Sequence, residues 1–162
     1  MRAYDMKEWS DFFVAAAGGS AALAGLLFVA VSINIERILK FRDLPGRALV
    51  TLLLLLGALV AALFGLTPQS HTALGVELLA GGLTISIAAL WVLIRSRPRA
   101  GEESHLASSL VTAIPGTVLY VVAGASLLAE SGGGLYWVLA GIVGAVIGAA
   151  LNAWVLLVEI LR

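Results

Sequence analysis

Long apolar runs, almost free of charge, are the feature that most constrains the fold of this chain. Each approaches or exceeds the roughly 20 residues that a helix needs to cross a hydrocarbon core of about 30 Å. Glu77 is the one formally charged residue inside them. The pattern predicts an all-α fold, a polytopic transmembrane helix bundle with five spans. The spans are expected at Phe12–Ile35, Ala48–Leu66, Thr72–Ile94, Leu106–Ala129 and Leu135–Val158.

Composition agrees with a lipid environment. Hydrophobic residues make up 60% of the chain and charged residues 12%, against about 25% charged residues in a typical soluble domain. The five runs leave no room for a second, soluble domain, so residues 1–162 are expected to form a single transmembrane domain. The first run is too long for the apolar part of a signal peptide, and the segment before it is mixed in charge, so we expect a retained first span.

The basic residues predict how the bundle is oriented. Eight of the ten Lys and Arg residues fall in the first and third connections and at the C-terminus, and two fall in the N-terminal segment. Because cytoplasmic loops carry the excess of Lys and Arg, the N-terminus is expected outside and the C-terminus inside. The expected cytoplasmic anchors are Arg37, Lys40, Arg42, Arg95, Arg97 and Arg99.

The polar end of the first run, Ser32 to Lys40, raises the question of a site. Its polar side chains are spread around the helix rather than along one face. We interpret this segment mainly as the cytoplasmic exit of the first helix, extended by a turn or two into water. Ser32 and Asn34 would lie deepest, where they could hydrogen-bond to a neighbouring helix.

Small residues recur at helical spacing on three of the predicted spans. Positions three, four and seven apart share a helix face. In lipid, small residues allow helix backbones to approach closely, so these stripes predict packing seams, either within one protomer or between protomers of a homo-oligomer. The expected packing residues are Gly18, Ala22, Gly25, Gly81, Gly141, Gly144 and Gly148.

The same stripes carry the candidate pore or ligand residues Glu77, Thr84, Asn152 and Ser32. An ionisable residue inside a membrane is by default a functional hypothesis, which makes Glu77 the first candidate. The alternative is that its side chain reaches the interface, or sits neutral in an apolar setting. For Asn152 the alternative is a hydrogen bond between helices.

Catalysis is not expected. The sequence lacks GxSxG, HExxH and GxxxxGK motifs. It has no cysteine, so disulfides and thiolate metal sites are excluded. The two histidines, His71 and His105, are predicted on opposite sides of the membrane, so no metal and no cofactor is expected. A net charge of zero gives no field that would attract nucleic acid.

The segment FFVAAAGGSAALAGLLFVAVSINIERIL, residues 12–39, carries a family resemblance. It resembles the start of a group of small bacterial polytopic membrane proteins of unknown function, some of which are labelled "modulator of FtsH protease". The resemblance covers the first span and implies a bacterial membrane protein. No functional residue is carried over from it.

Two function hypotheses follow. The first is a homo-oligomeric, channel-like or small-solute- or ion-binding bundle in the inner (cytoplasmic) membrane of a bacterium. The alternative is a non-catalytic regulatory or scaffolding subunit of another membrane complex. The expected partners are the lipid bilayer, further copies of the chain and possible membrane-protein partners.

Overall fold

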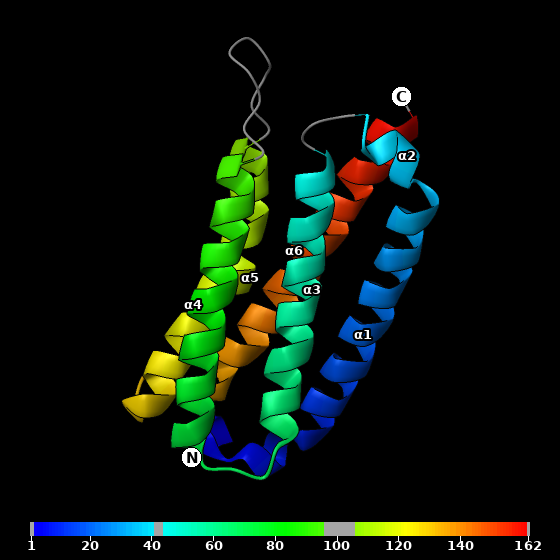
Figure 1. The fold of residues 1–162 in the computed structure, drawn as a ribbon. Coiled ribbons are helices and arrows are strands. Elements are labelled where there is room, and N and C mark those ends of the chain that lie inside the picture. Colours follow the sequence, from blue (N-terminus) through cyan, green and yellow to red (C-terminus); the bar gives the residue numbers. More distant parts are fainter. Residues whose placement is uncertain (1, 41–43, 96–105, 162) are drawn as a thin grey trace.

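The fold is an all-helical bundle. The computed structural model describes residues 2–40, 44–95 and 106–161, and in this part of the chain all regular structure is helical (Figure 1). Two short 3₁₀ helices come first, and six α-helices follow. Their bounds are η1 Arg2–Tyr4, η2 Met6–Trp9, α1 Ser10–Ile33, α2 Ile35–Ile38, α3 Leu44–Leu66, α4 His71–Arg95, α5 Leu106–Leu128 and α6 Leu135–Leu161.

The predicted all-α class is confirmed, and within the described residues four segments are long and apolar enough to cross a membrane. They are Met6–Ile33, Leu44–Leu66, His71–Val92 and Leu135–Leu156. Helix α5 coincides with the predicted fourth span. Its apolar part within the described residues, Gly116–Leu128, is shorter, and the fifth crossing stays a prediction.

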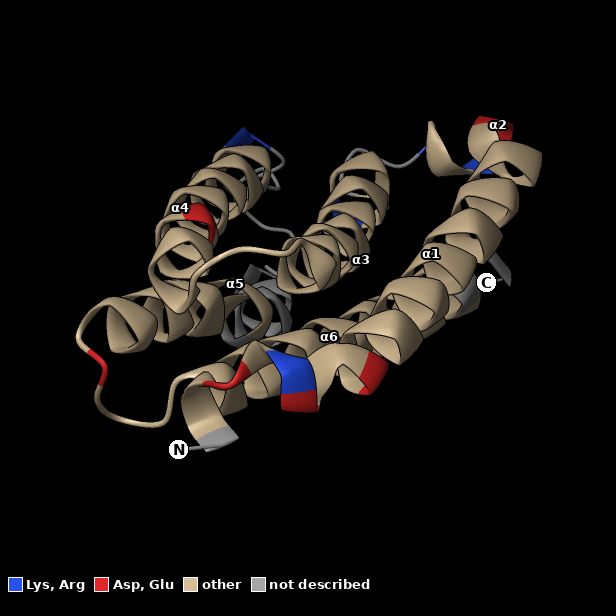
Figure 2. Ribbon diagram, turned by 90° about the horizontal axis from the view of Figure 1, so that it is seen from below, with Lys and Arg blue, Asp and Glu red and all other residues tan. Residues whose placement is uncertain are grey.

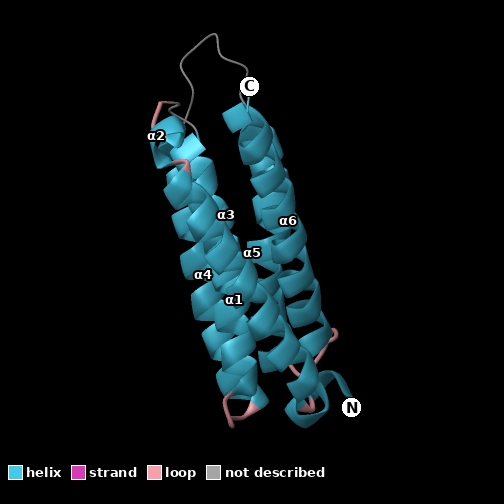
Figure 3. Ribbon diagram, turned by 90° about the vertical axis from the view of Figure 1, so that its right-hand side faces the viewer, coloured by secondary structure: helices cyan, strands magenta, loops and turns pink. Residues whose placement is uncertain are grey.

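The five long helices run along one axis in alternating directions, so that α1 begins at one end of the bundle and α6 finishes at the other (Figure 1). Seen from the side, α1, α3 and α4 form one layer and α5 and α6 another, with the loops at the two ends (Figure 3). Helix α3 packs against α1, α4, α5 and α6 and is therefore the centre of the bundle. Helix α1 lies at the edge, with α3 as its main neighbour.

The core forms where small side chains on the central helix allow close approach. Ala58 and Ala62 of α3 are 0% exposed, and so is Ala145 of α6. Tyr120 from α5, at 2% exposure, contributes a large ring to the same core cluster. Short side chains on several helices thus accommodate one large aromatic side chain from another.

The first helix breaks where the sequence predicted that it would continue. Helix α1 ends at Ile33, Asn34 adopts φ −103° and ψ 13°, and α2 starts at Ile35. The Asn34 side chain donates a 2.9 Å hydrogen bond to the carbonyl of Ala30 in its own helix, and not to a neighbouring helix, which the sequence had left open. Such local bonding competes with helix continuation. The break lets Ile38, 1% exposed, pack in a cluster with Leu44 and Leu156.

The N-terminal segment folds back across the end of the bundle. The backbone N–H of Gly133 donates to the Tyr4 hydroxyl at 3.4 Å. The ring of Trp9 meets the ring of Tyr136 edge-on, with centroids 4.9 Å apart. The segment thereby covers the start of α6 and the connector between α5 and α6. We call this end of the bundle, where α1, α4 and α6 begin, the N-terminal end.

Candidate functional site

The four candidate pore residues do not form one site. Glu77 lies near the start of α4 and Ser32 near the end of α1, at opposite ends of the bundle (Figure 1). Thr84 is exposed on α4 and donates a 2.7 Å hydrogen bond to the carbonyl of Ala80. Asn152 is 4% exposed on α6, which is separated from α4 by α3 and α5. Residues from three helices thus point to different surroundings rather than to a common path.

Glu77 is held by the turn between α3 and α4. Its Oε2 atom accepts a 2.7 Å hydrogen bond from Nε2 of Gln69. The same nitrogen donates to the carbonyl of Phe64 at 2.9 Å, near the end of α3, where backbone carbonyls lack helical partners. The half-buried carboxylate is therefore drawn toward the N-terminal end. This arrangement matches the alternative in which Glu77 reaches toward the interface.

A narrow cleft runs beside Glu77 between α3 and α4. Its free volume is about 10 Å³, which is close to the least that one water molecule requires. The lining residues are Gly57, Val60, Ala61, Phe64, Glu77, Leu78, Gly81, Gly82, Ile85 and Tyr120. A cleft of this size between the helices does not provide a conduit for a solute.

Tyr120 occupies the centre of the bundle and is enclosed by glycines from three other helices. A Cβ added at Gly141 would lie 2.9 Å from its Cε1 atom, and one at Gly82 would lie 3.0 Å from its Cβ. Gly57 faces the opposite edge of the ring, where an added Cβ would lie 3.9 Å from Cε2. The Tyr120 hydroxyl is buried and has no hydrogen-bond partner among the described residues. Tyr120 was not among the residues predicted from the sequence, although its hydroxyl in the middle of an apolar run was a visible signal.

The predicted packing residues fall into two groups. Gly141 and Gly148 of α6 are buried, Gly144 is half-buried, and Gly81 of α4 lies 3.9 Å from the Phe64 ring by the same added-Cβ measure. Gly18, Ala22 and Gly25 of α1 are instead exposed. At Gly18 and Gly25 an added Cβ would meet no atom within 4 Å. Within the protomer, the α1 stripe therefore faces outward.

Three of the predicted basic anchors lie in the described structure, at the end of the bundle opposite the N-terminal end. Arg37 and Lys40 are exposed at and just after α2, and Arg95 is exposed at the end of α4. The Arg95 guanidinium lies over the Trp91 ring at 4.7 Å. Arg42, Arg97, Arg99 and His105 fall outside the described residues.

Arg47 is a further basic residue whose position the sequence did not predict. It lies in the first turns of α3 and is 6% exposed. Arginine is almost never fully buried unless it is paired. From the sequence, Arg47 was only one of the positive charges of the first connection.

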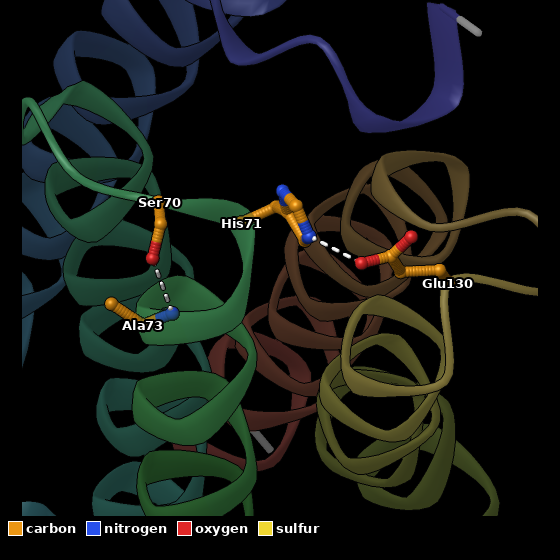
Figure 4. A network of polar contacts seen from close by, with 4 residues as sticks. All are labelled: Ser70, His71, Ala73 and Glu130. Atoms are coloured by element: carbon orange, nitrogen blue, oxygen red, sulfur yellow. Dashed lines mark hydrogen bonds and ion pairs between the residues drawn. The ribbon is translucent and has the colours of Figure 1, made fainter.

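An open pocket lies at the N-terminal end, between the N-terminal segment and the α3–α4 turn. It has a volume of about 450 Å³ and is lined by Tyr4, Asp5, Met6, Lys7, Gln69, Ser70 and His71. Ser70 precedes α4, and its hydroxyl oxygen accepts a 3.2 Å hydrogen bond from the N–H of Ala73. At the same end of the bundle, Nε2 of His71, at the start of α4, lies 3.1 Å from Oε1 of Glu130 in the α5–α6 connector (Figure 4).

The described residues hold no group of three or more His, Cys, Asp or Glu side chains that could ligate a metal. No family model, no curated protein and no solved structure matches this chain. Its chemistry therefore has to be argued from the geometry of its own residues.

Proposed function

We propose that this chain is a non-catalytic membrane bundle that regulates or scaffolds membrane complexes through lateral helix contacts. In this proposal it crosses the inner membrane of a bacterium five times, with its N-terminus outside and its C-terminus in the cytoplasm. The positions of Arg37, Lys40 and Arg95 at one end of the bundle support that orientation, because basic residues gather on the cytoplasmic side.

The observation that carries the proposal is the open face of α1. At Gly18, Gly19 and Gly25 an added Cβ would meet nothing within 4 Å. On the other helices, by contrast, most of the glycines have close neighbours: a Cβ added at Gly65 would lie 2.6 Å from the Phe13 ring. Helix α1 thus packs along one side through Phe13 and leaves its small-residue side without a partner in the described part of the protomer.

In a lipid environment, the small-residue face of α1 is suited to packing against another helix. Helices in a membrane are not driven together by hydrophobicity, and close backbone approach at small residues supplies van der Waals contact instead. Gly18 and Ala22 are four residues apart, the spacing of the small-xxx-small motif. A second copy of α1 could pack against this face. A helix of another membrane protein could also pack there if it carried a matching stripe of small residues.

Cysteine cross-linking tests the proposal directly, because the chain has no native cysteine. Single cysteines at Gly18, Ala22 and Gly25 would be oxidised in native membranes. Leu83→Cys is the matched control, since Leu83 is 50% exposed on α4. We expect cross-linked products at the α1 positions and not at residue 83.

A second variant checks that these products come from packing of the small-residue face. In the Ala22→Cys background, Gly18→Leu places a bulky side chain one turn away on the same face. We expect the cross-link at residue 22 to be lost, because the helix backbones could no longer approach closely. Equal cross-linking at residue 83, or none at α1, would contradict the proposal.

A second candidate, an ion or solute conduit at the axis of an oligomer, is favoured by a different observation. Ser32 is exposed at the end of α1, and Thr84 is exposed on α4, so each carries a polar group to the outer surface of the protomer. An oligomer could line an axis with such groups. Flux through liposomes containing verified oligomers tests this candidate, with Ser32→Leu and Thr84→Val as variants. Absence of flux in the wild type would exclude it.

A further inference from the structure

The open pocket at the N-terminal end is built from two walls that the fold holds in place. One wall is the N-terminal segment, fixed by the contacts of Tyr4 with Gly133 and of Trp9 with Tyr136. The other is the α3–α4 turn, fixed by the hydrogen bonds that Gln69 makes at the end of α3 and on α4. The volume of about 450 Å³ lies within the usual range of roughly 300–1,000 Å³ for small-molecule sites.

The pocket offers both signs of charge on one wall. Asp5 accepts a 3.1 Å hydrogen bond from the backbone N–H of Lys7 through Oδ1, and Oδ2 has no partner among the described residues. The Lys7 ammonium likewise has none there. Figure 2 shows acidic and basic positions of the N-terminal segment next to one another at this end of the bundle. A ligand could therefore meet an anionic and a cationic group a short distance apart.

The opposite wall adds hydrogen-bonding groups with defined roles. The amide nitrogen of Gln69 is engaged by Phe64 and Glu77, so its oxygen remains as an acceptor. The Ser70 oxygen already accepts from Ala73, which leaves its O–H as a donor. The wall thus presents an acceptor next to a donor.

His71 completes this wall, and Glu130 orients it. An ionised carboxylate only accepts hydrogen bonds, so Nε2 of His71 donates to Glu130. In the neutral imidazole, Nδ1 is then an acceptor. Figure 4 shows this second nitrogen turned away from Glu130 and toward the N-terminal segment.

We propose that this pocket binds a small zwitterion, in which an ammonium group and an oxyanion are held a few bonds apart. The ammonium is bound by Asp5 Oδ2 and His71 Nδ1, and the oxyanion by the Lys7 ammonium and the Ser70 hydroxyl. Two sources carry this chemistry: a free solute such as phosphoethanolamine, and the head group of a phosphatidylethanolamine lipid. The inference is independent of the α1 face and of any oligomer.

The first arm of the test is calorimetric titration with O-phosphoethanolamine, using the full chain in a non-ionic detergent and a phosphate-free buffer. Ethanolamine alone and inorganic phosphate alone are the half-ligand controls. We expect a Kd of about 1 mM or lower for the zwitterion. Lys7→Met and Asp5→Asn should each weaken binding about tenfold or more, since each removes a charge-assisted hydrogen bond. Asparagine keeps the acceptor that caps Lys7, so the segment should stay folded.

The second arm measures lipid retention by native mass spectrometry after exposure to phosphatidylethanolamine or phosphatidylglycerol. Lys40→Met and Asp11→Asn are the matched control variants, because neither residue lines the pocket. Selective retention of phosphatidylethanolamine that Lys7→Met abolishes would assign the lipid head group, whereas binding of the soluble zwitterion alone would assign a solute. Equal affinity for either half-ligand, unchanged binding in both pocket variants, or no binding in either arm would overturn the proposal.

Discussion

The ring of Tyr120 on α5 lies so close to Gly141 on α6 that a Cβ added there would be 2.9 Å from its Cε1 atom. Separations under 3.0 Å are essentially never seen for real Cβ atoms. The glycine therefore sets how near α6 can come to α5, and the aromatic ring fills the space. This pair fixes the distance between two helices in the second layer of the bundle.

Gly141→Ala should destabilise the protein by about 1–3 kcal/mol, the usual cost of overpacking a core. Gly81→Ala is the matched control, because its nearest neighbour would be the Phe64 ring at 3.9 Å, an ordinary contact. That control should be neutral or gain up to about 1 kcal/mol from helix propensity. Thermal or SDS-induced unfolding in detergent measures both, and equal loss of stability in the two variants would contradict the assignment.

Tyr120→Phe should leave stability unchanged or raise it by about 1 kcal/mol. The Tyr120 hydroxyl is buried without a partner among the described residues, and an unsatisfied buried polar group costs free energy. Tyr120→Ala, by comparison, should cost about 3–5 kcal/mol through the cavity it leaves. The same unfolding measurement applies. A large loss in Tyr120→Phe would mean that the hydroxyl has an essential partner.

Gln69→Leu should destabilise the protein by about 1–3 kcal/mol, because it removes the donor of the Glu77 carboxylate and one of the two donors to the Phe64 carbonyl, which keeps the N–H of Thr67. Glu77→Gln keeps an acceptor for Gln69 and should cost less than Glu77→Leu. Thr67→Val is the control, since its hydroxyl bonds to the carbonyl of Leu63 on an exposed surface. If Glu77→Gln and Glu77→Leu proved equally destabilising, hydrogen bonding by Gln69 would not explain the role of Glu77.

Glu130→Gly should be neutral or stabilising. Glu130 has φ 49°, a left-handed conformation that costs a residue with a side chain roughly 1–2 kcal/mol. The exposed pair that Glu130 forms with His71 contributes only about 0–1 kcal/mol of stability. Glu130→Val, with a branched side chain at the same φ, should destabilise instead. Unfolding midpoints of the two variants provide the check, and a reversed order would contradict it.

Parts of the candidate site could be predicted from the sequence and parts could not. The interior carboxylate Glu77 was identified because a charge in an apolar run stands out. Its donor Gln69 was not, because it lies eight positions away across a turn whose geometry brings the two together. The spacing rule placed Gly18 and Gly141 in equivalent stripes, yet one faces outward and the other lies against Tyr120. Helical periodicity identifies a face but not its neighbour.

The amino-acid sequence by itself determined the helical class and the approximate limits of the long helices, since these follow from hydrophobicity and length along a single segment. Only the tertiary structure decided that α1 breaks at Asn34, that Tyr120 is enclosed by glycines, and that the N-terminal segment and the α3–α4 turn form a pocket. The last two depend on which segments meet in space, and the break, next to a local hydrogen bond of Asn34, allows Ile38 to pack with Leu44 and Leu156. Because an apolar helix can bury any of its faces in a bundle or in lipid, that choice is made by mutual packing.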